Sequence, residues 1–208
     1  MSARCLYLDL DGTLLGRGAS LLHDGEGAVS IEGVRGIQAC LRAGVEVVLM
    51  SGRRRTQVAE DARLLGGDSY IFEADALLAK HGHRDLRLVD NGAVGRRSPA
   101  LAALPQVRGY HLVPAQASKV GAVAVHRRAR GYAREQCLAV GDSREDLACA
   151  AQVGSFWLVA NALERDPSLR EAIAAADNVR VAESGHGAGV YEAVLSTLAS
   201  ARAAHAPG

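Results

Sequence analysis

Short apolar runs alternate along this chain with longer segments in which apolar residues recur every three or four positions. The runs cover residues 5–8, 45–50, 70–72, 137–140 and 156–159. Runs of this length are typical of strands that are buried on both faces of a parallel sheet, and the segments between them have the period of helices. The sequence therefore predicts an α/β protein with a doubly wound parallel sheet.

The segments between the runs have the caps and apolar faces of helices. Ser30 is the expected N-cap of the first one, whose inward face is expected to carry Ile31, Val34, Ile37 and Leu41. Thr56 is the expected cap of the second. Further helices are expected near residues 119–130, 145–152 and 169–175. An edge strand is expected at 178–181, and a last helix at 188–203 with Val190, Val194, Leu195 and Leu198 inward.

The composition is that of an ordinary globular protein. The chain has 208 residues, of which 49% are hydrophobic and 23% charged, and its formal net charge is +1. Nothing in the charge balance points to nucleic acid or to a membrane surface, and no apolar run approaches the length of a membrane span. The four cysteines match neither a zinc pattern nor a disulfide framework, so we expect a reducing, cytoplasmic setting.

The pentapeptide Asp9-Leu10-Asp11-Gly12-Thr13 follows the first apolar run, so two carboxylates emerge where that strand ends. Ligands of open α/β sheets bind outside the carboxyl ends of the strands, and buried carboxylates need a cationic partner. A plain polar turn would use the same residue types. A calcium loop is excluded because its glycine would be sixth and a glutamate twelfth; here the glycine is fourth and Ser20 is twelfth.

Three later segments place further polar groups at strand or helix ends. Ser51 and Gly52 follow the second strand, where a hydroxyl and backbone N–H groups make an oxyanion-binding corner. Lys119 begins a helix, a position that opposes the helix dipole unless the lysine faces an anion. Asp142 and Asp146 follow the strand at 137–140, and Asp142 is placed to complete a metal site with Asp9. Taken singly, each of these segments also has an interpretation without function: a loop serine, a solvated lysine, or acids that favour a helix N-terminus.

In this order the four segments resemble the motifs of the haloacid dehalogenase superfamily. Asp9-Leu10-Asp11-Gly12-Thr13 is similar to the first motif, Ser51 to the second, Lys119 to the third, and the Gly141-Asp142-Ser143 segment with Asp146 to the fourth. The first and fourth motifs are specific, and the resemblance extends over nearly the whole chain. It implies a Rossmann-like core and a phosphatase activity.

The resemblance also implies a role for each site residue. Asp9 would be the nucleophile, which forms an aspartyl-phosphate, and Asp11 the acid and base. Phosphate would be bound by Ser51, Gly52, Lys119 and Asn161. Mg²⁺ would be held by Asp9, the backbone carbonyl of Asp11, Asp142 and, through water, Asp146. An exposed loop asparagine is the alternative interpretation of Asn161.

Spacing places a cap between the second and third motifs. About 30 residues separate Thr13 from the second strand, which leaves no room for a cap there. We therefore expect a core of residues 1–72 and 119–208 with a small α+β cap at residues 73–118. This placement resembles the second cap class, subgroup IIB, which contains Cof-type, sucrose-phosphate and mannosyl-3-phosphoglycerate phosphatases. Two positions depart from the subgroup: Glu145 stands where it usually has asparagine, and Ala74-Asp75-Ala76 where it often has Asn-Gly-Ala.

The function expected from this resemblance is a Mg²⁺-dependent phosphomonoesterase that acts on a small phosphorylated metabolite, such as a sugar or polyol phosphate. The alternatives are a phosphomutase of the same superfamily and a non-catalytic phosphate-binding or scaffold protein. We expect no nucleic-acid partner and no membrane. Because the cap is small, a homodimer could cover the open site.

Overall fold

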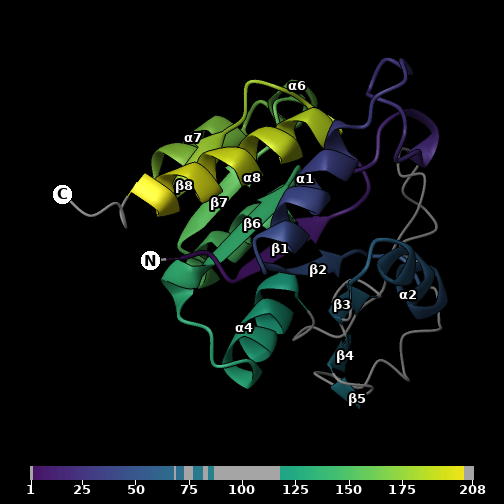
Figure 1. The fold of residues 1–208 in the computed structure, drawn as a ribbon. Coiled ribbons are helices and arrows are strands. Elements are labelled where there is room, and N and C mark those ends of the chain that lie inside the picture. Colours follow the sequence, from purple (N-terminus) through teal and green to yellow (C-terminus); the bar gives the residue numbers. More distant parts are fainter. Residues whose placement is uncertain (1, 68, 73–76, 82–83, 87–117, 204–208) are drawn as a thin grey trace, which may run out of the picture.

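The computed structural model describes residues 2–67, 69–72, 77–81, 84–86 and 118–203, which form a sheet with helices on both faces (Figure 1). The strand order is β5-β4-β3-β2-β1-β6-β7-β8. Six strands run parallel: β1 (Cys5–Asp9), β2 (Glu46–Met50), β3 (Ser69–Phe72), β6 (Cys137–Gly141), β7 (Ser155–Leu158) and β8 (Val179–Val181). The prediction of a doubly wound parallel sheet is confirmed.

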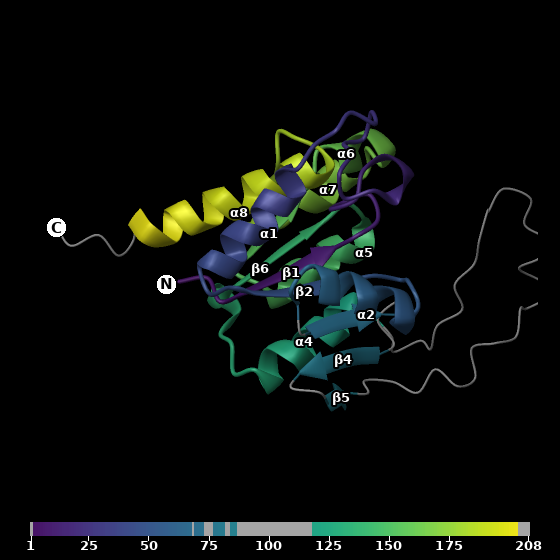
Figure 2. The same cartoon turned by 45° about the vertical axis from the view of Figure 1, so that its right-hand side comes forward.

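Two helical layers enclose the sheet. One contains α1 (Glu32–Arg42), α2 (Arg55–Leu64) and α8 (His186–Ala203), and the other contains α4 (Lys119–Ala129), α5 (Arg144–Leu147), α6 (Asn161–Arg165) and α7 (Leu169–Ala174). Short 3₁₀ helices lie at η1 (Arg17–Ala19), η2 (Arg134–Gln136) and η3 (Ala148–Gln152). Figure 2 shows α1 and α8 above β1 and β2 and α4 below them. No helix of the described residues is both long and apolar enough to cross a membrane.

Alternate residues of each central strand pack into two hydrophobic cores, one on each face of the sheet. Leu6 and Leu8 of β1 pack with α1 and α8, whereas Cys5 and Tyr7 pack with α4. All four are fully buried, as the period of two along a strand requires when both faces are covered. This double burial is why the strands read as unbroken apolar runs.

The expected inward face of α1 was partly wrong. Ile31 and Leu41 are 55% and 47% exposed, and the buried positions are Gly33, Gly36, Ile37 and Cys40. The cause is the close packing of α1 on α8: a Cβ atom on Gly36 would lie 3.3 Å from the Cα of Tyr191. Glycines therefore make this contact and rotate the helix away from the face that the apolar period favours. On α8, Leu195 is likewise 40% exposed.

Other elements also differ from their expected form. The helix expected at 145–152 is divided into α5 and η3, and α6 was not expected at all.

Within the stretch predicted to be the cap, β4 (Leu77–His81) and β5 (Arg84–Leu86) extend the sheet. β4 pairs antiparallel with β3, and β5 pairs antiparallel with β4. Residues 87–117, which make up most of the expected cap, lie outside the described part of the chain. The cap stays a prediction.

The topology creates a crevice at the carboxyl end of β1. The chain passes from β1 to β2 on one side, and β6 later pairs with β1 on the other. The connections from these strands therefore diverge to opposite sides, which is the switch point where ligands bind in sheets of this kind.

Candidate active site

The carboxyl ends of β1, β2 and β6 and the start of α4 meet around one pocket of about 540 Å³. Seven of the eight site residues expected from the sequence line it: Asp9, Asp11, Ser51, Gly52, Lys119, Asp142 and Asp146. The eighth, Asn161, does not. A pocket of similar size between α1 and α8 is lined by Arg35, Tyr191 and Leu195 among others and contains no carboxylate. The clustered acids make the first pocket the candidate site.

Asp9 ends β1 and is buried, with both carboxylate oxygens in contact with a donor. Lys119 Nζ donates to Oδ1 at 2.9 Å, and Thr13 Oγ1 donates to Oδ2 at 2.8 Å. Burial, followed by the charge of Asp146, raises the pKa of Asp9 to about 7, and Lys119 opposes that rise. These contacts hold the carboxylate in one orientation at the floor of the pocket.

Asp11 lies two residues further on and faces solvent, with a side chain that is 52% exposed. Arg53, which follows β2, binds both of its oxygens: Nε donates to Oδ2 at 2.7 Å and Nη2 to Oδ1 at 2.5 Å. Arg53 Nη1 also donates to Asp61 on α2, at 3.1 Å. The same pentapeptide thus supplies one buried and one accessible carboxylate.

Ser51 and Gly52 form the turn after β2. Ser51 is buried, its backbone N–H donates to the carbonyl of Ile71 at 3.0 Å, and its Oγ accepts the N–H of Arg53 at 3.2 Å. Pairing with β3 therefore fixes the serine, while its hydroxyl and Gly52 border the pocket. Such a turn can present polar hydrogens to an anion.

Lys119 is the first residue of α4, whose N-cap is Ser118: the serine Oγ accepts the N–H of Gly121 at 3.1 Å. The lysine is 6% exposed, and Nζ also donates to Asp146 Oδ1 at 2.8 Å. A buried ammonium between two carboxylates is compensated in charge, which explains a lysine at a helix start.

Asp142 and Asp146 follow β6, and Ser143 between them is the N-cap of α5. The N–H groups of Asp142 and Ser143 donate to Asp146 Oδ2 at 3.2 and 3.1 Å. The close approach requires Gly141, because a Cβ atom there would lie 2.2 Å from Asp146 Cβ. Asp146 is therefore held by the loop and by Lys119, whereas Asp142 is directed into the pocket.

These acids fit a hard divalent cation. Asp9, Asp142 and Asp146 each offer an oxygen within 4.8 Å of the others. Asp142 Oδ2 is buried and accepts no hydrogen bond from the described residues, and burial raises the pKa of Asp142 despite the opposing charge of Arg165. Oxygen-only ligands of this kind suit Mg²⁺. Asp146 accepts hydrogen bonds at both oxygens, from Lys119 and from the loop after β6.

Arg165 is a site residue that the sequence did not reveal. It comes from α6, and its Nη1 lies 2.6 Å from Asp142 Oδ2. The element itself was not expected, since a five-residue helix has too few apolar positions for a period to show. The only signal was its position just after the neighbouring strand β7.

Asn161 braces the loop of the pentapeptide. Its Nδ2 donates to the carbonyl of Gly12 at 2.9 Å, and its Oδ1 accepts the N–H of His186 at 2.9 Å. Both ends of the amide are thus used to tie the Asp11 loop to the start of α8. These contacts position the site, and a direct contact with phosphate stays a prediction.

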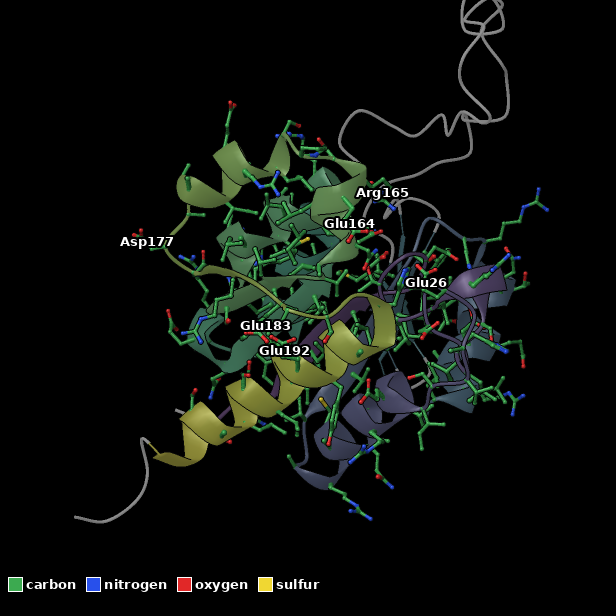
Figure 3. The ribbon with its side chains drawn as sticks, turned by 90° about the horizontal axis from the view of Figure 1, so that it is seen from above. Glu26, Glu164, Arg165, Asp177, Glu183 and Glu192 are labelled. Carbon is green, nitrogen blue, oxygen red and sulfur yellow. The ribbon has the colours of Figure 1, made fainter. Side chains whose placement is uncertain are left out.

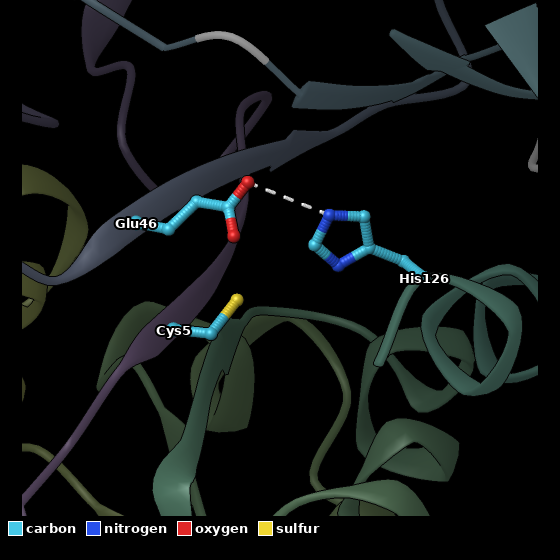
Figure 4. A group of neighbouring side chains, drawn as sticks. All are labelled: Cys5, Glu46 and His126. Atoms are coloured by element: carbon cyan, nitrogen blue, oxygen red, sulfur yellow. Dashed lines mark ion pairs between the residues drawn. The ribbon is translucent and has the colours of Figure 1, made fainter. Parts of the chain in front are cut away.

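A second group of metal-ligating types, Cys5, Glu46 and His126, lies at the opposite end of the sheet (Figure 4). The Glu46 carboxylate already accepts hydrogen bonds from Ser69 at 2.9 Å, Arg130 at 3.0 Å and Tyr132 at 2.9 Å. His126 Nε2 lies 3.6 Å from Glu46, and Nδ1 pairs with the Tyr7 hydroxyl at 2.9 Å. This group is a polar network that joins α4 to the sheet.

The sequence of the chain is similar to that of a known phosphatase. No protein-family model matches the chain. A phosphoglycolate phosphatase of Methanothermobacter thermautotrophicus is 28% identical over 231 aligned residues, which cover 92% of this chain and 97% of the relative.

Several solved structures have a fold similar to that of this chain. A Thermoplasma acidophilum protein has a TM-score of 0.71 at 16% identity, with 95% of this chain and 99% of that chain covered. A haloacid dehalogenase-like hydrolase of Bacteroides thetaiotaomicron has a TM-score of 0.67 at 17% identity, covering 94% and 99%. The cobalt-bound deoxy-D-mannose-octulosonate 8-phosphate phosphatase of Haemophilus influenzae has a TM-score of 0.58 at 17% identity, covering 99% and 94%.

The chain therefore shares its fold with solved structures that include a haloacid dehalogenase-like hydrolase. Its site sets Asp9 and Asp11 at the end of β1, Lys119 beside them and Asp142 across from them. The chain is also similar in sequence, at 28% identity, to a phosphatase over 92% of its length.

Proposed function

We propose that the protein is a Mg²⁺-dependent phosphomonoesterase of the second cap class that hydrolyses a small phosphorylated metabolite through an aspartyl-phosphate on Asp9. The observation that carries the proposal is the contrast between the two carboxylates of the pentapeptide. The Asp9 side chain is 7% exposed and held by Lys119, whereas the Asp11 side chain is 52% exposed and borders the open pocket. A fixed nucleophile and an accessible proton carrier are what the two steps of the reaction require.

In the first step, an Asp9 carboxylate oxygen attacks phosphorus and the bond from phosphorus to the alcohol oxygen breaks. Asp11 gives its proton to the departing alkoxide, which leaves as the alcohol. In the second step, Asp11 takes a proton from water while the water oxygen attacks phosphorus. The bond to Asp9 then breaks, and inorganic phosphate and the Asp9 carboxylate are regenerated.

The remaining groups stabilise charge on the phosphoryl oxygens. Lys119, the Ser51 hydroxyl and the Gly52 turn border the pocket around Asp9 and are placed to donate to them. Mg²⁺ would be held by Asp9, the Asp11 backbone carbonyl and Asp142, with Asp146 acting through water, and it would neutralise charge on the phosphoryl group. Arg53 occupies both oxygens of Asp11, so this pair has to open before Asp11 can transfer a proton.

The substrate class is proposed to be a sugar or polyol phosphate. The pocket volume of about 540 Å³ is in the usual range for small ligands. The relative in Methanothermobacter is named for phosphoglycolate, a phosphorylated hydroxy acid, and the arginines that border the pocket suit such an anionic substrate. We therefore retain phosphorylated hydroxy acids as a second substrate class.

A panel of phosphate esters tests the proposal. Phosphate release would be measured with sugar, polyol, glycolate and glycerate phosphates, nucleotides and an aryl phosphate, with Mg²⁺ and with a chelator. The expected result is metal-dependent turnover of a small ester, lost in Asp9→Asn. Absence of turnover on every ester would contradict the proposal and favour a phosphate-binding scaffold. Transfer of phosphate to a second hydroxyl of the substrate without its release would favour a phosphomutase.

A further inference from the structure

Arg165 reaches the active site from α6 and contacts Asp142 in two ways. Its Nη1 lies 2.6 Å from Asp142 Oδ2, and its Nη2 donates to the backbone carbonyl of Asp142 at 3.0 Å. The arginine side chain is 56% exposed, whereas that of Asp142 is 4% exposed. Figure 3 labels Arg165 beside Glu164 on α6. A cation from the solvent side therefore covers a carboxylate that is otherwise buried.

The contact involves Asp142 Oδ2, a buried carboxylate oxygen of a residue in the acidic group that could hold a metal. Asp142 Oδ2 accepts no hydrogen bond from the described residues, so Arg165 meets it as an ion pair without good hydrogen-bond geometry. The backbone of Gly12 closes another side, because a Cβ atom there would lie 2.1 Å from Oδ2 and 3.2 Å from Arg165 Nη1. A divalent cation and a guanidinium repel each other strongly at such distances. Binding of a divalent cation at Oδ2 is therefore expected to displace the Arg165 contact.

We propose that Arg165 is the resident counter-ion of Asp142 in the metal-free enzyme, that the divalent cation displaces its Nη1 from Oδ2, and that Arg165 thereby sets the affinity for the metal. The inference rests on the proposed function in one respect, the binding of metal at Asp142. The Nη2 contact to the backbone carbonyl does not involve the carboxylate, so it can persist after displacement. The guanidinium then stays at the border of the pocket, where it adds positive charge for an anionic substrate.

Metal binding without substrate tests this directly. Calorimetric titration of Mg²⁺ into the metal-free protein would compare wild type with Arg165→Gln, Arg165→Lys and Arg170→Gln. Arg170 is exposed on α7, so its replacement removes the same charge outside the pocket. We expect Arg165→Gln to bind Mg²⁺ about threefold to tenfold more tightly, since the pair it removes is partly solvated. Arg165→Lys keeps the charge but cannot make both guanidinium contacts, so its affinity should lie between those of wild type and Arg165→Gln.

Thermal unfolding provides a second readout. In a chelator, Arg165→Gln should unfold at a lower temperature than wild type because Asp142 loses its counter-ion. With saturating Mg²⁺ the two proteins should converge. An affinity of Arg165→Gln equal to or weaker than that of Arg170→Gln would overturn the proposal and leave Arg165 a structural brace.

Asp142→Asn separates this inference from the proposed function. If Asp142→Asn binds Mg²⁺ as wild type does, the metal is not at Asp142 and both the metal site and the Arg165 proposal fail. If Asp142→Asn loses Mg²⁺ while Arg165→Gln leaves the affinity unchanged, the metal site stands and only the role of Arg165 is wrong.

Discussion

At the scale of single residues, the site depends on how two aspartates separated by one leucine acquire different surroundings. Asp9 is the last residue of β1 and lies beneath Lys119 and Thr13, while Leu10 is buried in the core and Asp11 emerges toward Arg53. Gly12, at φ +87°, turns the chain sharply enough to bring the loop against Asp142. The two acids therefore differ in burial and partner although they are two positions apart.

Asp11→Asn should slow hydrolysis most for esters with poor leaving groups. An alkyl alkoxide needs a proton to leave, whereas an aryl oxide leaves with less help, so the loss of the acid affects the two unequally. We expect an about 10²- to 10⁴-fold loss of kcat with an alkyl phosphate and a much smaller loss with an aryl phosphate. Steady-state rates on both esters give the ratio. Equal losses would argue against Asp11 as the proton donor.

Gly12→Ala should cost more stability than an alanine at another left-handed glycine. The added Cβ would lie 2.1 Å from Asp142 Oδ2, and φ is unfavourable for alanine. Gly44 is the matched control, because its φ is +68° with no atom within 4 Å of an added Cβ. We expect a loss of about 1 kcal/mol for Gly44→Ala and about 2–4 kcal/mol for Gly12→Ala in urea unfolding. Equal losses would mean that the Asp142 contact is unimportant.

At the scale of elements, α4 is held at both ends. Its first residue, Lys119, reaches the site, and near its other end His126 lies beside Glu46 of β2 (Figure 4). Arg130, just after the helix, also pairs with Glu46. Ser69 of β3 and Tyr7 of β1 complete this network. The far end of the sheet thus helps to fix the helix that presents the lysine to Asp9.

Glu46→Gln should destabilise the protein at neutral pH and much less in acid. Burial alone would raise the pKa of Glu46, but the neighbouring His126 and the hydrogen bonds from Ser69 and Tyr132 lower it to about 2 from an ordinary 4.5. Because the pKa of Glu46 is lowered in the folded protein, its ionised carboxylate stabilises the fold fully above about pH 4.5. This stabilisation is lost as the pH falls toward 2. Urea unfolding of both proteins should show a difference of about 2–3 kcal/mol at pH 6 that shrinks at lower pH. A constant difference would contradict this account.

The elements could be predicted where local pattern decides them. The parallel strands, α4 and α8 were expected within a few residues, because strands buried on both faces leave continuous apolar runs. The inward face of α1 could not be predicted, since the glycine contact with α8 sets it. Neither could α6, which is too short to show a period. The structure of residues 87–117 lies outside the described part of the chain, so the expected cap is untested.

At the scale of the whole molecule, distant segments come together only through the sheet order. Because β1 lies between β2 and β6, polar residues after all three strands share one crevice, and this follows from parallel topology alone. The sequence therefore predicted which residues would meet at the pocket. It could not predict the ion pairs of Arg53 with Asp11 or Arg165 with Asp142, because these depend on side-chain geometry between remote segments.

Removal of the divalent metal should abolish hydrolysis and lower the unfolding temperature. The pocket holds four aspartates, and a bound cation compensates them only in the folded state. At a Mg²⁺ concentration about 100 times its Kd, linkage gives a stabilisation of about 2.7 kcal/mol. Activity and thermal unfolding would be followed through chelation and restoration of Mg²⁺. Full turnover in excess chelator would rule out a metal-dependent reaction.

The most direct test of the central claim is to trap the covalent intermediate. The enzyme would be mixed with a phosphate ester that it hydrolyses, and the reaction would be quenched in acid within the first turnover. The protein would then be digested and its peptides analysed by mass spectrometry. We predict one phosphoryl group on the peptide that contains Asp9, absent from Asp9→Asn and discharged when quenching is delayed beyond substrate depletion. Sustained turnover with no phosphorylated peptide at any quench time, together with activity of Asp9→Asn, would contradict the account.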